Sequence, residues 1–147
     1  MRIPIPEECT QRNNGAEIVC AERGRKIRFL NPNKREVMRY LIDDCTLLRA
    51  SLGSPACKLC DYIVLAWRSE EHYIELKGAN VERAFGQLAS TIPLFRMAGP
   101  DERIYCWIIT TESPATSSKF TVLKTKFEKA FNARLTIRTN QYEHPLE

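Results

Sequence analysis

The sequence has no apolar stretch that approaches the ~20 residues of a membrane-spanning helix. Its N-terminal stretch, MRIPIPEECTQRNN, lacks the apolar central region of a secretory signal. It also has no internal repeat and no long low-complexity segment. From these absences we expect a cytoplasmic protein with no membrane partner.

Histidine is scarce, since the chain has only His72 and His144. A histidine-based catalytic triad or a histidine-rich metal site is therefore not expected. The sequence also has no glycine-rich loop of the kind that binds phosphates. Hydroxyl side chains are abundant over residues 110–118, but no partner base for them is visible.

The chain has six cysteines, although nothing in the sequence signals secretion. We therefore interpret them mainly as small buried hydrophobic residues rather than as disulfides. Cys57 and Cys60 have the CxxC spacing of half a zinc site, but no second CxxC or HxxxH follows. Cys9, Cys20 or Cys45 could complete such a site only through the fold.

Length and composition indicate one domain over residues 1–147, with 44% apolar residues to form its core. The net charge of +4 is compatible with a nucleic-acid partner, although solvated surfaces explain most such charges.

The first half of the chain is predicted to be mostly β-structure. Residues 1–15 are polar and rich in Pro and Asn, which predicts an irregular lead-in. Segments 17–21 and 26–30 alternate as strands around a turn at ERGR. Segment 36–43 fits either a helix or a strand, and we favour the strand.

The second half is predicted to alternate between strands and helices. Strand 61–67 turns at residues 68–71 into strand 72–77. Asn80 is a good N-cap for a helix over 81–92, which Pro93 is expected to close. The remaining expected elements are a strand over 103–110, a helix capped by Ser118 and a strand over 134–139. This order predicts an α/β (α+β) fold with a mixed central β-sheet, an antiparallel hairpin and flanking helices.

The stretch HYIELK carries charges where a strand is expected. Ile74 and Leu76 point to one face, whereas Tyr73, Glu75 and Lys77 point to the other. If that second face is covered, its charges need partners or a metal ion, because burying a lone charge costs several kcal/mol.

A second carboxylate, that of Asp61, is expected at the same end of the hairpin as Glu75. Two carboxylates suit Mg²⁺ or Mn²⁺, and Lys77 beside them could orient an attacking water. A turn with an even number of residues would place Asp61 on the opposite face from Glu75. The catalytic hypothesis therefore predicts a three- or five-residue turn, a bulge or a bend.

Asp61, followed after thirteen residues by Glu75-Leu76-Lys77, resembles the PD-(D/E)XK nuclease superfamily and its small restriction-endonuclease-like members. The resemblance covers about residues 60–110 and implies a nuclease-like core over 60–140. It implies that Asp61 and Glu75 bind the metal and that Lys77 is catalytic. Some members also use a polar residue on the next helix, where Gln87 lies. The chain departs from the family pattern in having Cys60 before Asp61 and no evident first helix.

We therefore expect an Mg²⁺-dependent nuclease that acts on DNA, alone, as a homodimer or with a partner protein. A basic stripe formed by Lys119, Lys126 and Lys129 could contact phosphates, and Asp43 or Asp44 could add a carboxylate. The alternative hypothesis is a catalytically inactive nuclease-fold module that binds a protein partner, such as an immunity or regulatory protein.

Overall fold

The structure is a computed structural model that describes residues 3–53, 58–66, 70–76, 80–111 and 118–146. Its strands are β1 (Thr10–Asn13), β2 (Glu17–Glu22), β3 (Arg25–Leu30), β4 (Val37–Leu41), β5 (Tyr62–Ala66), β6 (Glu70–Leu76), β7 (Ile104–Thr110), β8 (Ala133–Thr139) and β9 (Gln141–Pro145). Its helices are the short 3₁₀ turn η1 (Glu7–Cys9), α1 (Thr46–Leu52), α2 (Val81–Phe95) and α3 (Ser118–Phe131).

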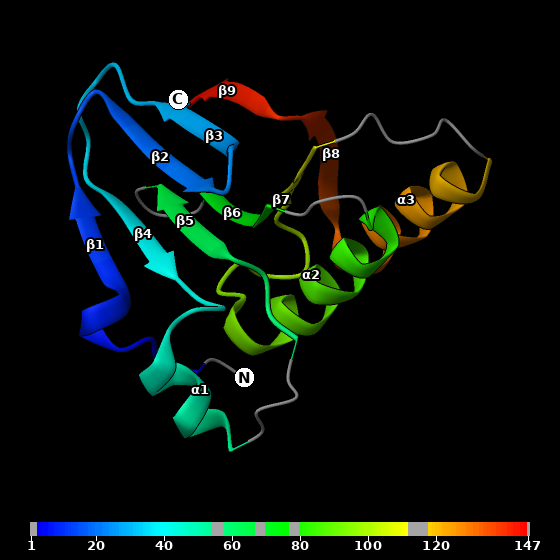
Figure 1. The fold of residues 1–147 in the computed structure, drawn as a ribbon, viewed down its shortest axis with the longest axis horizontal. Helices are drawn as coiled ribbons and strands as arrows, with labels where there is room; N and C mark the ends of the chain where they lie inside the picture. Colours follow the sequence, from blue (N-terminus) through cyan, green and yellow to red (C-terminus); the bar gives the residue numbers. More distant parts are fainter. Residues whose placement is uncertain (1–2, 54–57, 67–69, 77–79, 112–117, 147) are drawn as a thin grey trace.

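In the described part of the chain, these strands form two sheets (Figure 1). The large sheet has the order β1-β4-β5-β6-β7-β8, and the small sheet has the order β2-β3-β9. Pairing is antiparallel from β1 to β6 and parallel from β6 to β8. The predicted α/β (α+β) fold, with a mixed sheet, an antiparallel hairpin and flanking helices, is therefore confirmed.

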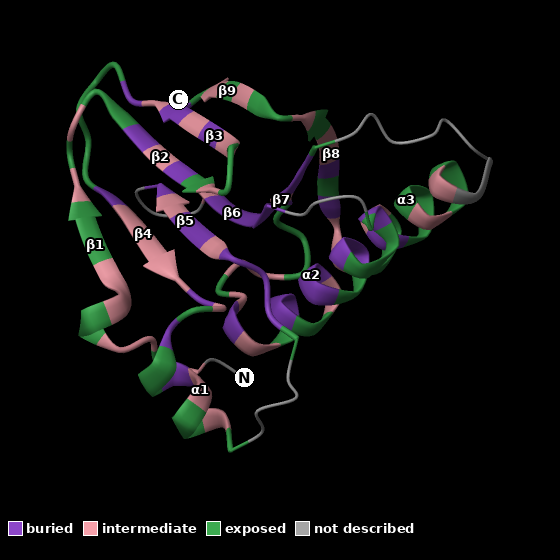
Figure 2. Cartoon of the chain, viewed as in Figure 1, coloured by how far each residue is buried: buried purple, intermediate pink, exposed green. Residues whose placement is uncertain are grey.

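The central strands of the large sheet, β5, β6 and β7, are covered on both faces (Figure 2). On one face, α2 and α3 bury a core that includes Tyr73, Leu88 and Ile108. On the other face, the small sheet buries a core that includes Phe29 and Trp107. The central strands therefore have almost no solvent-exposed face, which explains their apolar sequences.

The β2–β3 hairpin confirms the turn predicted at ERGR. Arg23 and Gly24 have φ angles of 48° and 83°. A two-residue hairpin turn of this kind needs positive φ at both central positions, which glycine adopts without strain. The strand favoured for segment 36–43 is also confirmed, as β4.

Several elements were not predicted. The expected lead-in over residues 1–15 contains η1 and β1, and α1 and β9 are also additional. β1 pairs only with β4, and β9 pairs only with β3, in the described sheets. Such edge strands are held by pairing rather than by an alternating apolar pattern, so the polar sequences TQRN and QYEHP gave no strand signal.

Helix α2 confirms the predicted N-cap, because Asn80 Oδ1 accepts a hydrogen bond of 3.0 Å from the Arg83 backbone N–H. The predicted end at Pro93 is wrong, since the helix continues to Phe95. Proline removes its own N–H bond and crowds the carbonyl of the preceding turn, but the Arg96 N–H still donates to the Ile92 carbonyl, and burial of Ile92 and Phe95 holds the last turn in place. None of the helices in the described ranges is long and apolar enough to cross a membrane.

A disulfide joins Cys9 and Cys45, whose Cα atoms lie 5.9 Å apart. This corrects the interpretation of these two cysteines as simple buried hydrophobic residues. Cys20, Cys60 and Cys106 are buried free thiols, as expected, and burial raises the pKa of each. Disulfides persist mainly in oxidising compartments. The bond therefore argues against the cytoplasmic location, which stays a prediction.

Removing the disulfide should destabilise the fold, because it links η1 to the start of α1 across 36 positions. Loop-closure entropy for that separation corresponds to about 3–4 kcal/mol. We expect the Cys9→Ala/Cys45→Ala variant to lose roughly this free energy of unfolding in urea titrations. A reductant should destabilise the wild type by a similar amount and leave the variant unchanged. Equal sensitivity of both proteins to the reductant would contradict the prediction.

Candidate metal and catalytic site

The register of the β5–β6 hairpin fixes the length of its connection but does not extend to Asp61. Tyr62 pairs with Ile74, and Ala66 pairs with Glu70. Three positions, 67–69, connect the strands and lie outside the described residues. This three-residue connection is the odd spacing that the catalytic hypothesis requires. Regular pairing nevertheless ends at Tyr62, because the N–H of Asp61 donates to the Ile74 carbonyl and Asp61 therefore departs from the register.

This register also shifts the predicted elements. Strand β6 begins at Glu70, within the segment predicted to be the turn. Ile74 and Leu76 point into the core between the sheets, whereas Tyr73 points into the core under the helices. Both faces of β6 are therefore buried.

Asp61 is held at the end of the hairpin by backbone contacts. Its N–H donates to the Ile74 carbonyl at 3.0 Å, and its own carbonyl accepts from the Ile42 N–H at 3.0 Å. Its carboxylate oxygen Oδ2 accepts a hydrogen bond of 2.7 Å from the Leu76 N–H. Only 8% of the residue is exposed. The carboxylate therefore lies at the same end of β6 as Glu75.

The surroundings of Asp61 disfavour its ionised form. Burial is the main cause, and the negative charges of Glu22, Asp43 and Asp44 add to it. The hydrogen bond from Leu76 opposes them, and the net effect raises the pKa of Asp61 from 3.8 to about 7. A buried carboxyl group with a strongly raised pKa is a common feature of functional sites.

Glu75 is 1% exposed and follows Tyr73 on the helix-facing side of the sheet. Next to burial itself, its charge is the largest influence that raises the pKa of the Cys60 thiol. Glu75 therefore lies close to Cys60, the residue that precedes Asp61 in the chain.

Gln87 is placed near this site by α2. Its Nε2 donates to the Leu59 carbonyl at 3.1 Å, two residues before Asp61. The amide oxygen of Gln87, Oε1, is buried and has no hydrogen-bond partner among the described residues. The amide oxygen is thus a further oxygen donor on the helix side of the hairpin.

Other predicted residues contribute less. Lys77 and Cys57 lie outside the described residues, so the catalytic lysine and the CxxC zinc hypothesis stay predictions. Asp43 forms an ion pair with Arg49, whereas Asp44 is exposed. Both aspartates act on Asp61 through their charge.

Sequence reasoning missed the roles of two sets of polar side chains, both of which involve β6. Glu71 is 2% exposed, and its carboxylate accepts from the Tyr73 hydroxyl and from the backbone N–H groups of Met97 and Ala98. The Glu71 carboxylate therefore has a structural role, because it binds the backbone of the segment that follows α2. No periodic pattern could have revealed this, because the donors lie 26 and 27 positions away.

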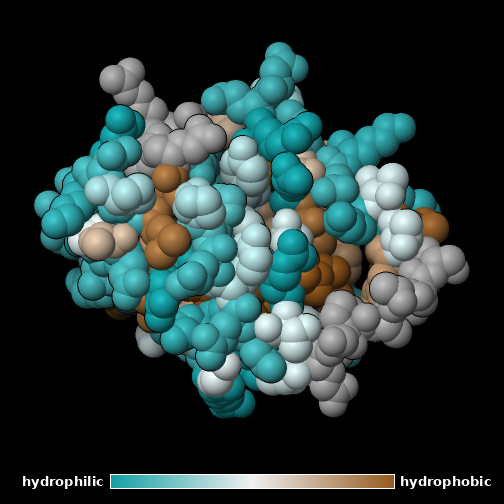
Figure 3. Space-filling view, turned by 90° about the horizontal axis from the view of Figure 1, so that it is seen from above, coloured by the Kyte–Doolittle hydropathy of each residue, from teal (hydrophilic) through white to brown (hydrophobic). Residues whose placement is uncertain are grey.

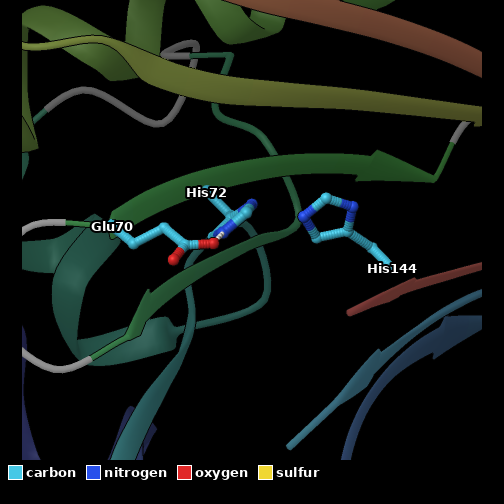
Figure 4. Close-up of side chains that lie close together, drawn as sticks. All are labelled: Glu70, His72 and His144. Atoms are coloured by element: carbon cyan, nitrogen blue, oxygen red, sulfur yellow. Dashed lines mark hydrogen bonds and ion pairs between the residues drawn. The ribbon is translucent and has the colours of Figure 1, made fainter. Parts of the chain in front are cut away.

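The second missed group is formed by Glu70, His72 and His144, whose potential metal-binding atoms lie within 4.8 Å of one another (Figure 4). Glu70 was predicted to lie in the turn before the strand, so its place on one strand face with His72 was not predicted. The approach of His144 was not, because it depends on the unpredicted strand β9.

Comparison with known proteins gives no match: no family profile fits the chain, and no curated protein or solved structure is significantly similar to it.

The raised pKa of Asp61 predicts a specific pH dependence of stability. A carboxyl group that binds its proton more tightly in the folded state favours folding at low pH. That contribution is lost as the pH rises from about 4 to about 7. In the wild type, the free energy of unfolding should fall by a few kcal/mol over this pH range, because one pKa unit corresponds to about 1.4 kcal/mol. We expect Asp61→Asn to lack this fall.

Urea titrations of both proteins from pH 4 to 8, without divalent ions, measure this decline. Contributions of the histidines cancel in the difference between the two profiles. A constant difference across the whole range would show that Asp61 does not titrate abnormally.

Proposed function

We propose that the protein is an Mg²⁺-dependent nuclease of the PD-(D/E)XK type that hydrolyses DNA. The observation that carries the proposal is that two buried carboxylates, those of Asp61 and Glu75, lie at the same end of the β5–β6 hairpin. The order of β5, β6, α2 and β7, with β7 parallel to β6, agrees with the strand–strand–helix–strand core of the resembled superfamily.

The residues present suit a hard divalent cation. Mg²⁺ and Mn²⁺ prefer oxygen ligands, which Asp61 and Glu75 supply as carboxylates and Gln87 supplies as an amide. A nearby cation would also offset the negative charge around Asp61 that raises its pKa. The acidic surroundings are therefore unfavourable without a counterion and favourable with one.

Each residue then has a role in phosphodiester hydrolysis. Asp61 and Glu75 hold the ion, and Gln87 supports them from α2. A bound Mg²⁺ would lower the pKa of a water molecule and offset the charge that develops on the phosphate. Lys77, two positions after Glu75, is assigned to orient the attacking water.

The proposed DNA contacts lie on the helix side of the molecule. Phe85 of α2 and Phe127 of α3 pack with their ring centroids 5.8 Å apart. This contact places the exposed Lys126 and Lys129 beside the helix that follows Glu75. Exposed lysines bind phosphates without reading sequence.

The outer face of the small sheet is a less suitable DNA-binding surface. In Figure 3 the molecule is seen from above, and that face is mainly hydrophilic. Its Arg28, however, forms ion pairs with Glu17 at 3.3 Å and Glu143 at 2.7 Å. A phosphate would have to compete with both carboxylates for this arginine.

One observation favours the alternative function, an inactive nuclease-fold module that binds a protein partner. Asp61 Oδ2 already accepts the Leu76 N–H, so the carboxylate has a structural use without any metal. Catalytic assays distinguish the two functions.

The proposed nuclease activity requires Lys77. With Mg²⁺ or Mn²⁺ the wild type should cut DNA, and Lys77→Ala should reduce the rate by roughly 10²–10⁴-fold, the usual contribution of a positioned proton-transfer group. Lys126→Ala, which removes an exposed lysine elsewhere, should retain the chemical step at saturating DNA. Absence of cleavage of single- and double-stranded DNA by the wild type would leave the binding module as the function.

Metal-dependent melting tests the ligands separately from catalysis. At 100 times its dissociation constant, Mg²⁺ should stabilise the wild type by ~2.7 kcal/mol. Glu75→Gln should abolish this effect, whereas the exposed control Glu36→Gln should keep it. An Mg²⁺ effect that survives in Glu75→Gln would place the ion elsewhere.

A further inference from the structure

A second set of potential metal ligands lies at the other end of β6 from Glu75. Glu70 and His72 are two positions apart on this strand and point toward the small sheet. His144 reaches them from β9, and Figure 4 shows the three side chains converging between the sheets. Residues 72 and 144 are the only histidines of the chain.

The surroundings hold His72 firmly. It is fully buried, and its ring lies 4.8 Å from that of Phe29 and 5.1 Å from that of Tyr105. Glu70 and His144 are only partly buried, so the cluster is open to solvent on one side. A site of this kind combines rigid ligands with a route for an ion and a water.

Hydrogen bonds define the proton on His72. The indole N–H of Trp107 can only donate, and it donates to His72 Nδ1 at 2.9 Å. The neutral ring therefore carries its proton on Nε2, which donates to Glu70 Oε1 at 2.8 Å. Burial lowers the pKa of His72, and burial together with His72 lowers the pKa of His144 to about 4. Both rings are thus neutral at pH 7, as metal ligands must be.

We propose that Glu70, His72 and His144 bind a first-row divalent transition-metal ion such as Zn²⁺, which joins β9 to β6. Two imidazoles and one carboxylate with an open fourth position are a common Zn²⁺ ligand set. Hard ions such as Mg²⁺ prefer all-oxygen sites. This cluster is therefore expected to bind a different metal ion from the site at Asp61 and Glu75. The proposal does not depend on nuclease activity.

Binding requires a small rearrangement. Tetrahedral Zn²⁺ ligands lie about 3.4 Å apart, so the 2.8 Å contact between Glu70 and His72 must open and His144 must approach. The proton on His72 Nε2 moves to Nδ1, which frees the Nε2 lone pair for the ion. Trp107 then loses its acceptor, and this loss weakens the binding of the metal.

The test is calorimetric titration of the full-length protein with ZnCl₂, with thermal melting as a second readout. We expect His144→Gln and Glu70→Gln to weaken Zn²⁺ binding by more than about tenfold, since loss of even an outer-shell partner costs roughly 10–100-fold. Glu143→Gln, an exposed neighbour on β9, should bind as the wild type does. Asp61→Asn should also keep the Zn²⁺ response.

Trp107→Phe gives the opposite expectation. Without the indole N–H, a proton on His72 Nδ1 no longer faces a second donor, so Zn²⁺ should bind more tightly than to the wild type. Absence of Zn²⁺ binding to the wild type, or full binding to both His144→Gln and Glu70→Gln, would overturn the site. Unchanged or weaker binding to a folded Trp107→Phe would overturn the assignment of Nε2 as ligand and the proposal with it.

Discussion

Strand β6 is buried on both faces, and the rest of the structure has to accommodate the ionisable groups that it carries. Water cannot solvate Glu71, His72 and Glu75, so each must be neutral, hydrogen-bonded or close to a counter-charge. Glu71 shows the hydrogen-bonded solution, because the Tyr73 hydroxyl and two backbone N–H groups surround its carboxylate. His72 shows the neutral solution, because burial lowers its pKa and its two ring nitrogens have defined partners.

The two ends of β6 differ in chemistry because different elements cover them. At the C-terminal end, Asp61 and Glu75 provide oxygen donors, and burial together with neighbouring acidic residues raises the pKa of Asp61. At the N-terminal end, His72 and His144 provide nitrogen donors within an aromatic environment. This difference separates the proposed Mg²⁺-dependent chemistry from the proposed Zn²⁺ site, so the two proposals can be tested independently in one protein.

The residues of the hairpin site could be selected from the sequence, but their arrangement could not. A carboxylate before one strand and a Glu-x-Lys at the end of the next are visible in the chain. Whether Asp61 and Glu75 share a position depends on the number of residues in the connection, because a shift by one residue moves a side chain to the other face. The pairing of Ala66 with Glu70 gives the odd connection, but Asp61 itself departs from the register, since its N–H donates to the Ile74 carbonyl. The use of Asp61 Oδ2 by Leu76 was likewise invisible in the sequence.

By itself, the sequence determined the elements with strong local signals: the hairpin at Arg23-Gly24, the apolar central strands and the helix that Asn80 caps. These depend on short-range patterns of turn residues, alternation and capping. Only the tertiary structure decided the edge strands β1 and β9, the Cys9–Cys45 disulfide and the meeting of His144 with His72. Each of these joins segments that are distant in the chain, and their stability comes from pairing and burial that no local pattern encodes.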